Sequence, residues 1–187
     1  MNSRATRESI VEAADELFYQ QGFEHTSFAH IASAVKISRG NFYYHFKAKD
    51  EILDAVIDLR LAKTEAMLEK WEMEGEGPED RILCFVHILI ANWAKIEKHG
   101  CPVGTLSAEL IKLDHVAKDE ATRLFTLFRK WLAKQFEELG READADELAM
   151  HLLARSQGVA TLASAFRDEI FFKSEVERMR SWLASLV

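Results

Sequence analysis

Proline, glycine and cysteine are scarce in this chain of 187 residues, which contains two prolines, eight glycines and two cysteines. So few helix breakers, among abundant alanine, leucine, glutamate, lysine and arginine, favour helix along nearly the whole length. The cysteines, Cys84 and Cys101, are too few for a disulfide framework and lack the paired spacing of a zinc site. We therefore expect an all-α fold with reduced thiols, no metal and no cofactor.

Long apolar runs are also missing. The longest lies near residues 88–91, far short of the roughly 20 apolar residues that a membrane helix needs. The first 18 residues carry acids at every turn and no apolar stretch that ends in small residues, so they resemble neither a secretory signal nor a transit peptide. The expected location is the cytoplasm, without membrane association.

The net charge of −7 argues at first against nucleic acid, because affinity for DNA comes largely from lysines and arginines that neutralise phosphates. The charge is unevenly distributed, however. Between residues 22 and 49 there is one acid, Glu24, against four bases and three histidines. This segment predicts a local positive surface on an otherwise acidic protein.

Apolar spacing and breaks divide the chain into about nine helices. Thr26 and Ser27 are suitable caps for the second helix, and Ser38 for the third. Ser174 followed by Glu177 predicts a capping box at the start of the last helix. From the third helix onward, the expected helices cover residues 39–46, 50–73, 79–99, 106–114, 116–139, 145–166 and 174–186.

Residues 26–46 have the pattern of a helix-turn-helix, with a short helix, a tight turn and a second helix that opens with serine. Phe42 and Phe46 lie one turn apart and should pack together on the preceding helices. The opposite side of that helix presents an arginine, a glycine and an asparagine. Arginine can bind guanine and asparagine adenine, while glycine permits close approach to the bases. Phosphate contacts are expected from Thr26, Ser27, Tyr43, Tyr44, His45 and Lys49.

The same segment resembles the N-terminal domain of the TetR family of bacterial repressors. The matching positions are Thr26, Ile31, Ala32, Ala34, Ser38, Gly40, Tyr43, His45, Phe46 and Lys49. Departures occur at Ser27, Val35, Lys36 and Phe42. Lys36 stands where glycine is usual, and a side chain in a left-handed turn costs about 1 kcal/mol. A phosphate contact by Lys36 would offset this cost. The predicted DNA-binding residues are Thr26, Ser27, Lys36, Ser38, Arg39, Gly40, Asn41, Tyr43, Tyr44, His45 and Lys49.

The resemblance implies a DNA-binding domain over residues 1–48 and an effector-binding and dimerisation domain over residues 49–187. The last two helices would pair with those of a second copy, so that the homodimer reads a palindromic double-stranded operator. Their spacing is compatible with exposed apolar side chains at Leu148, Leu152, Val159, Leu162, Met179, Trp182 and Leu186.

The resemblance also implies a pocket for a small-molecule effector among the central helices. Aromatic and polar residues there are the candidates, although such a stripe is more often core than ligand cage. Asn92 lies on a nearly all-apolar helix and needs a polar partner. The candidate effector residues are Phe85, His87, Asn92, Trp93, Cys101, Phe125, Phe128 and Trp131.

Residues 100–110, GCPVGTLSAEL, resemble a stretch in one branch of the family that has a Gly-Cys pair in a loop. Positive charge from Lys98 and His99 would favour the thiolate of Cys101, which makes an electrophile- or redox-sensing repressor an alternative. The other interpretation is that Cys101 is a small buried apolar residue.

Two further classes compete with a ligand-responsive regulator. An enzyme is disfavoured because the sequence contains no catalytic triad order, nucleophile elbow, phosphate loop or HExxH motif. A helical interaction module would have no need of exposed groups that read a DNA groove. We expect a repressor whose effector shifts the long helix that starts near Asp50, and the sequence specifies neither the effector nor the operator.

Overall fold

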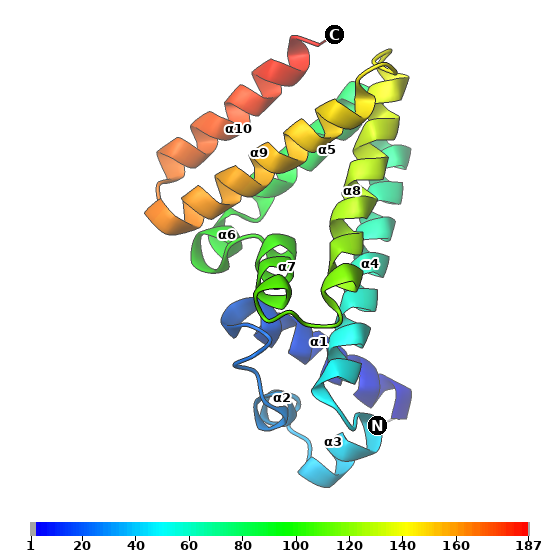
Figure 1. The fold of residues 1–187 in the computed structure, drawn as a ribbon, viewed down its shortest axis with the longest axis vertical. Coiled ribbons are helices and arrows are strands. Elements are labelled where there is room, and N and C mark those ends of the chain that lie inside the picture. The colour runs from blue at the N-terminus through cyan, green and yellow to red at the C-terminus, as the bar shows by residue number, and fades with distance from the viewer. Residues whose placement is uncertain (1–2, 187) are drawn as a thin grey trace. The chain divides into compact units, whose positions relative to one another are not determined.

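The computed structural model describes residues 3–186, and its regular elements in that range are all helices, which confirms the all-α prediction. Figure 1 shows the described helices coloured along the chain. None of them is long and apolar enough to cross a membrane. Their bounds are α1 Ser3–Gln21, α2 Phe28–Val35, α3 Arg39–His45, α4 Lys49–Glu74, α5 Pro78–Ala91, α6 Trp93–His99, α7 Pro102–Lys112, α8 Lys118–Glu138, α9 Ala145–Phe166 and α10 Glu169–Ala184.

The described chain divides into two compact units. Unit 1 extends to Lys63 and includes Thr105–Arg123, and unit 2 comprises Thr64–Gly104 and residues 124–186. The helices α4, α7 and α8 therefore contribute residues to both units. The functional boundary expected between residues 48 and 49 concerns DNA contact rather than packing, and it stays a prediction.

The core of unit 1 forms where the apolar sides of α1, α2, α3 and the first half of α4 meet. Ile10, Ala14 and Phe18 recur at four-residue steps along α1, and all three are buried. An ion pair reinforces the packing, because Arg60 Nε on α4 lies 2.6 Å from Asp15 Oδ1 on α1. The helices of unit 1 are thus held by both apolar and charged contacts.

Side chains and a left-handed residue define the two short helices of unit 1. The Ser27 hydroxyl accepts from the backbone N–H of His30, and His30 Nδ1 accepts in return from the Ser27 N–H, so that histidine completes a capping box. Lys36 ends α2 at φ 56, which confirms that the turn places a non-glycine residue in the left-handed region. Ser38 then caps α3 as predicted by accepting from Asn41 N.

The core of unit 2 is built from α5, α8, α9 and α10, and its largest fully buried side chains include Ile82, Phe136 and Phe172. Figure 1 shows α9 and α10 running side by side. Arg167 ends α9 in the left-handed conformation, and the Asp168 side chain caps α10 by accepting from Phe171 N. The predicted capping box at Ser174 and Glu177 is therefore wrong: α10 begins earlier, and both residues lie inside it.

Other helix boundaries also differ from the sequence prediction, and three of them have a local cause or a clear offset. The helix expected over residues 79–99 is interrupted at Asn92, whose side-chain amide donates to the carbonyl of Ile88. Asn92 competes for a helical carbonyl and so finds its polar partner locally. The helix α7 begins at Pro102 rather than at residue 106, since proline suits a first helical turn. The helix α8 begins at Lys118, two residues later than expected.

The exposed side chains of α9 and α10 are not those expected from spacing. Leu152, Val159 and Met179 are buried in the core of unit 2, while Leu148, Trp182 and Leu186 are half-buried there. Leu162 is exposed as expected. The prediction was wrong for the three buried residues because apolar spacing does not distinguish packing within one chain from packing between two. The large apolar residues exposed on these helices are Met150, Leu162, Phe166 and Ile170.

Candidate nucleic-acid interface

The helix α3 has one buried face and one exposed face. Phe42 and Phe46 are both 1% exposed, as their spacing predicts. The Phe42 ring packs against Phe28 with centroids 5.0 Å apart, and the Arg7 guanidinium lies 4.7 Å from the centroid of Phe46. The outward face carries the exposed residues Arg39, Gly40, Asn41, Tyr43 and Tyr44, with His45 half-buried beside them.

Gly40 has no packing partner that would demand a glycine. A Cβ placed there would meet no heavy atom of the described chain within 4 Å, apart from adjacent backbone, and the φ of Gly40 lies outside the left-handed region. Glycine inside a helix costs about 1 kcal/mol relative to alanine. Packing within the described chain therefore does not account for a glycine at this position.

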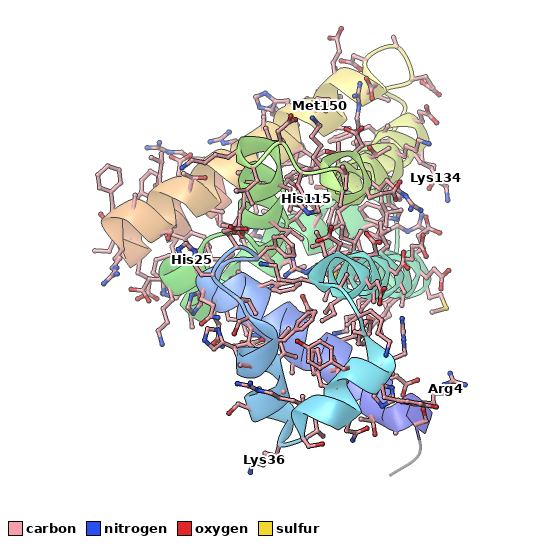
Figure 2. The ribbon with its side chains drawn as sticks, turned by 60° about the horizontal axis from the view of Figure 1, so that its bottom comes forward. Arg4, His25, Lys36, His115, Lys134 and Met150 are labelled. Carbon is pink, nitrogen blue, oxygen red and sulfur yellow. The ribbon has the colours of Figure 1, made fainter. Side chains whose placement is uncertain are left out.

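A hollow of about 480 Å³ lies between the start of α2, α3 and the beginning of α4. The cations Arg39 and Lys49 line it together with the Ser27 hydroxyl and the Tyr43 ring. Lys36 lies outside the hollow, at the turn before α3, and points away from the body of unit 1 (Figure 2). The remaining predicted contact residues outside the hollow are Ser38, Gly40, Asn41, Tyr44 and His45.

Thr26 and Lys49 are engaged within unit 1 rather than free at its surface. Thr26 is 1% exposed, and its hydroxyl donates to the carbonyl of Gly22 at 2.6 Å. Lys49 Nζ donates to the carbonyls of Phe23 and Glu24 at 3.1 and 3.2 Å, and it lies over the Phe23 ring. Both residues therefore shape the loop between α1 and α2.

Glu109 on α7 holds the same loop and was missed by the sequence analysis. Its carboxylate oxygens accept from the backbone N–H groups of Phe23 and Glu24, each at 2.9 Å. A side chain at Gly22, whose φ is 87, would approach the Glu109 carboxylate to 2.9 Å. The interval of 85 residues or more between the partners leaves no local signal from which the contact could be predicted.

His115, in the turn after α7, adds a second contact to this loop. Its ring packs edge-on against Phe23 with centroids 5.2 Å apart. His115 Nδ1 accepts from Ala117 N at 3.1 Å, so the ring proton sits on Nε2, which lies 3.5 Å from Asp50 Oδ1 at the start of α4. His115 thus connects the loop, the turn and α4 within unit 1.

The predicted effector residues all belong to unit 2, where most of the aromatic ones pack in pairs. Phe85 pairs with Phe128 and Trp93 with Phe172, at centroid distances of 5.5 and 4.6 Å. Trp131 is buried against Trp71, and Phe125 packs on the same core. His87 is exposed on α5 and is not brought into this group.

The two cysteines of unit 2 have different surroundings. Cys101 is half-buried, and Gln157 Nε2 donates to its Sγ at 3.4 Å. Burial raises the pKa of the Cys84 thiol, and the nearby carboxylates of Asp80 and Glu74 raise that pKa further. No group of three or more histidine, cysteine, aspartate or glutamate side chains suited to a metal ion occurs among the described residues.

Comparison with known proteins places this geometry in a family. Residues 10–56 match a sequence model described as bacterial regulatory proteins of the tetR family, and residues 78–175 match one described as the C-terminal domain of LmrA/YxaF-like transcriptional regulators. The second match alone covers more than half of the chain.

Individual relatives align with this chain over most of its length. An uncharacterized HTH-type transcriptional regulator in the lacX 3' region of Lactococcus lactis subsp. lactis is 28% identical, over 96% of this chain and 94% of the relative. The HTH-type transcriptional repressor DhaR of Mycobacterium sp. (strain GP1) is 26% identical, over 81% and 79%. A TetR transcriptional regulator from Legionella pneumophila superimposes with a TM-score of 0.83 at 26% identity, covering 100% of both chains. The chain therefore belongs to the TetR family of bacterial transcriptional regulators, with a C-terminal domain of the LmrA/YxaF-like type.

Proposed function

We propose that this protein is a repressor whose homodimer occupies a palindromic operator through α3 and releases it when an effector binds in unit 2. The observation that carries the proposal is the outward face of α3, where exposed polar residues surround a glycine that internal packing does not require. We propose repression rather than activation because the relative DhaR is named a repressor. A regulator of this kind acts where the DNA is, which for a bacterial protein means the cytoplasm.

The exposed side chains divide into base-reading and phosphate-binding groups. Arg39 and Asn41 have the chemistry to read guanine and adenine in the major groove. Tyr43, Tyr44 and Lys36 would contact the phosphates on either side, together with Ser27, Ser38 and His45. Thr26 and Lys49 would contribute by fixing the loop that carries the start of α2, unless Lys49 exchanges its carbonyl partners for a phosphate.

The dimer is proposed to form through α9 and α10. Met150, Leu162 and Phe166 are exposed on α9, and Ile170 is exposed at the start of α10. Phe166 and Ile170 are 71% and 83% exposed, and large apolar side chains this exposed are candidates for burial in an interface. Two-fold symmetry would then place two copies of α3 in successive major grooves, about 34 Å apart.

Effector binding is proposed to act through α4. This helix begins at Lys49, which holds the loop before α2, and its last residues belong to unit 2. An effector that binds one orientation of α4 more tightly shifts the equilibrium between the operator-bound and free forms. The shift in free energy cannot exceed the difference between its binding free energies for the two orientations.

A specific observation favours Cys101 as a second sensing element of the Gly-Cys type. Gln157 Nε2 donates to Sγ of the half-buried Cys101 at 3.4 Å, whereas Cys84 is disfavoured as a nucleophile by its raised pKa. An electrophile such as N-ethylmaleimide should release the operator from the wild type and from Cys84→Ser but not from Cys101→Ser. Equal release from both variants would exclude Cys101 as the sensor.

The main proposal is tested by fluorescence anisotropy with DNA from upstream of the protein's own gene. The double variant Arg39→Ala/Tyr43→Ala should lose specific binding while it keeps the helical circular dichroism of the wild type. Lys130→Ala, which removes an exposed cation on α8, is the matched control and should bind normally. Intact specific binding by the double variant would overturn the assignment of α3 as the reading helix.

A further inference from the structure

Three side chains in the core of unit 2 carry N–H groups that have no hydrogen-bond partner among the described residues. They are Arg81 Nε on α5, and Trp131 Nε1 and Gln135 Nε2 on α8. Trp131 is 7% exposed and Gln135 is fully buried. Native proteins satisfy the great majority of buried polar groups, because an unpaired buried donor loses its hydration without compensation.

The three side chains that carry these donors are neighbours in unit 2. Trp131 and Gln135 are one turn apart on α8 and project from the same side of that helix. Arg81 Nη1 donates to Gln135 Oε1 at 3.3 Å and to Glu138 Oε2 at 2.9 Å, which joins α5 to α8 at this point. Gly75 leaves room for Arg81, because a Cβ there would lie 2.6 Å from Arg81 Cγ.

The unpaired atoms are all donors, so a matching ligand must supply acceptors. The Gln135 carbonyl is already used by Arg81, which fixes the amide so that its NH₂ group is the free end. Trp131 can only donate. A ligand atom that fits this group is therefore an oxygen with lone pairs and no hydrogen.

The charges around the donors are already balanced. Arg81 is paired with Glu138, and Lys134 Nζ lies 2.9 Å from Glu72 Oε1. A carboxylate ligand would add an uncompensated charge at a buried position. This balance favours a neutral carbonyl oxygen over a carboxylate.

Aromatic rings border the same group. Trp71 on α4 packs against Trp131 with ring centroids 5.7 Å apart and planes tilted by 57°. Trp71 is half-buried and lies one turn before α4 ends, so its ring is the more exposed of the two and offers a flat molecule a stacking surface beside the donors. We propose that the effector is a planar aromatic compound with a neutral carbonyl oxygen, bound beside Trp71 by the N–H groups of Trp131, Gln135 and Arg81.

This inference rests on the proposed function and deepens it, since it names the chemistry of the effector. It also replaces much of the expected effector set: of those residues it retains Trp131, and it adds Gln135 and Arg81. No sequence pattern selects Gln135, because a glutamine on an amphipathic helix is usually solvated.

Acetophenone, ethylbenzene and benzoate test the proposal, since their shapes are similar and only the first has a neutral carbonyl. Calorimetric titration of the full-length protein should give acetophenone an affinity about tenfold above that of ethylbenzene, the effect of a hydrogen bond worth about 1.4 kcal/mol. Benzoate should bind more weakly than acetophenone. Equal affinity for acetophenone and ethylbenzene, or tighter binding of benzoate, would overturn the proposal.

Variants assign the effect to the named donors. Trp131→Phe keeps a ring but removes the N–H, and Gln135→Met keeps the length but removes the amide. Each should reduce the preference for acetophenone over ethylbenzene, whereas Trp182→Phe, which removes an indole N–H on α10 that is outside the unpaired set, should keep it. A preference that survives in both donor variants would overturn the assignment.

Operator binding without ligand is measured in parallel to separate two kinds of failure. If the wild type binds its operator but does not discriminate the two neutral probes, the proposed function stands and the effector chemistry is wrong. If it binds no operator yet prefers acetophenone, the proposed function fails and the carbonyl site stands.

Discussion

Glu109 accepts the backbone N–H of Phe23 with one carboxylate oxygen, while its other oxygen accepts the N–H of Glu24. This carboxylate on α7 therefore fixes the loop that leads into the helix-turn-helix. Lys49 holds the same loop from α4 through the carbonyls of Phe23 and Glu24. The backbone of these two loop residues is thus satisfied by two side chains from different helices of unit 1.

Replacing Glu109 by glutamine should loosen this loop. The amide retains one acceptor oxygen and places a donor against the second N–H, which costs about 1–3 kcal/mol of unfolding free energy. Urea denaturation should show the loss, and operator affinity measured by anisotropy should fall with it. Glu142→Gln changes an exposed carboxylate and serves as the control. Stability equal to that of Glu142→Gln would mean that the loop does not depend on Glu109.

Substitution of Gly22 by alanine should be more harmful than the same change at Gly140. Both glycines have a positive φ, 87 and 86, so each alanine carries a backbone cost of about 1 kcal/mol. At Gly22 the new methyl would also meet the Glu109 carboxylate, whereas at Gly140 it meets nothing within 4 Å in the described chain. The difference between the two unfolding free energies measures the steric contact with Glu109, and it should shrink when Glu109 is replaced by alanine, which removes the group that the methyl would meet.

Gly40→Ala should separate folding from DNA binding. The methyl group meets no atom of the described chain within 4 Å and improves helix propensity, so the unfolding free energy should rise by up to about 1 kcal/mol. Operator affinity should nevertheless fall, because the methyl group would stand between α3 and the bases. Gly77→Ala adds a methyl group at another open position and should leave operator affinity unchanged. Parallel losses of stability and affinity at Gly40 would contradict this account.

Lys36→Gly should stabilise the protein while lowering its affinity for DNA. Glycine relieves the left-handed strain at φ 56, a gain of about 1 kcal/mol. If Lys36 contacts a phosphate, the slope of the logarithm of affinity against the logarithm of salt concentration should decrease by about 0.9. Lys112→Gly, at the end of α7, is the control for loss of one positive charge. An unchanged salt slope would remove Lys36 from the set of phosphate contacts.

The sequence was most informative where the governing interactions are local. The four-residue interval between Phe42 and Phe46 predicted their shared buried face, and the serines at 27 and 38 predicted the caps. Lysine at position 36, where the family usually has glycine, correctly predicted a side chain in a left-handed turn. Each of these features depends on atoms within about one helical turn.

Prediction was weaker where a local signal had a competitor or where no local signal exists. Ser174 can cap a helix, but α10 is capped by Asp168, which lies six residues earlier in the chain. The spacing of Leu152 and Met179 fits an interface as well as it fits a core. Only the fold shows that both residues belong to the core. Glu109 and Gln135 act through partners more than 50 residues away, so composition and periodicity say nothing about either.

The helix α4 extends unbroken over 26 residues, a length of about 39 Å at 1.5 Å per residue. At its first residue, Lys49 donates to a carbonyl of the loop before α2. Close to its end, Trp71 packs against Trp131, one of the unpaired donors of unit 2. A continuous helix resists changes of length but tilts readily, and a tilt of about 5° over this length displaces one end by about 3 Å. An effector that tilted α4 by this angle, as the proposed function requires, would therefore displace its far end by about the spacing of adjacent base pairs.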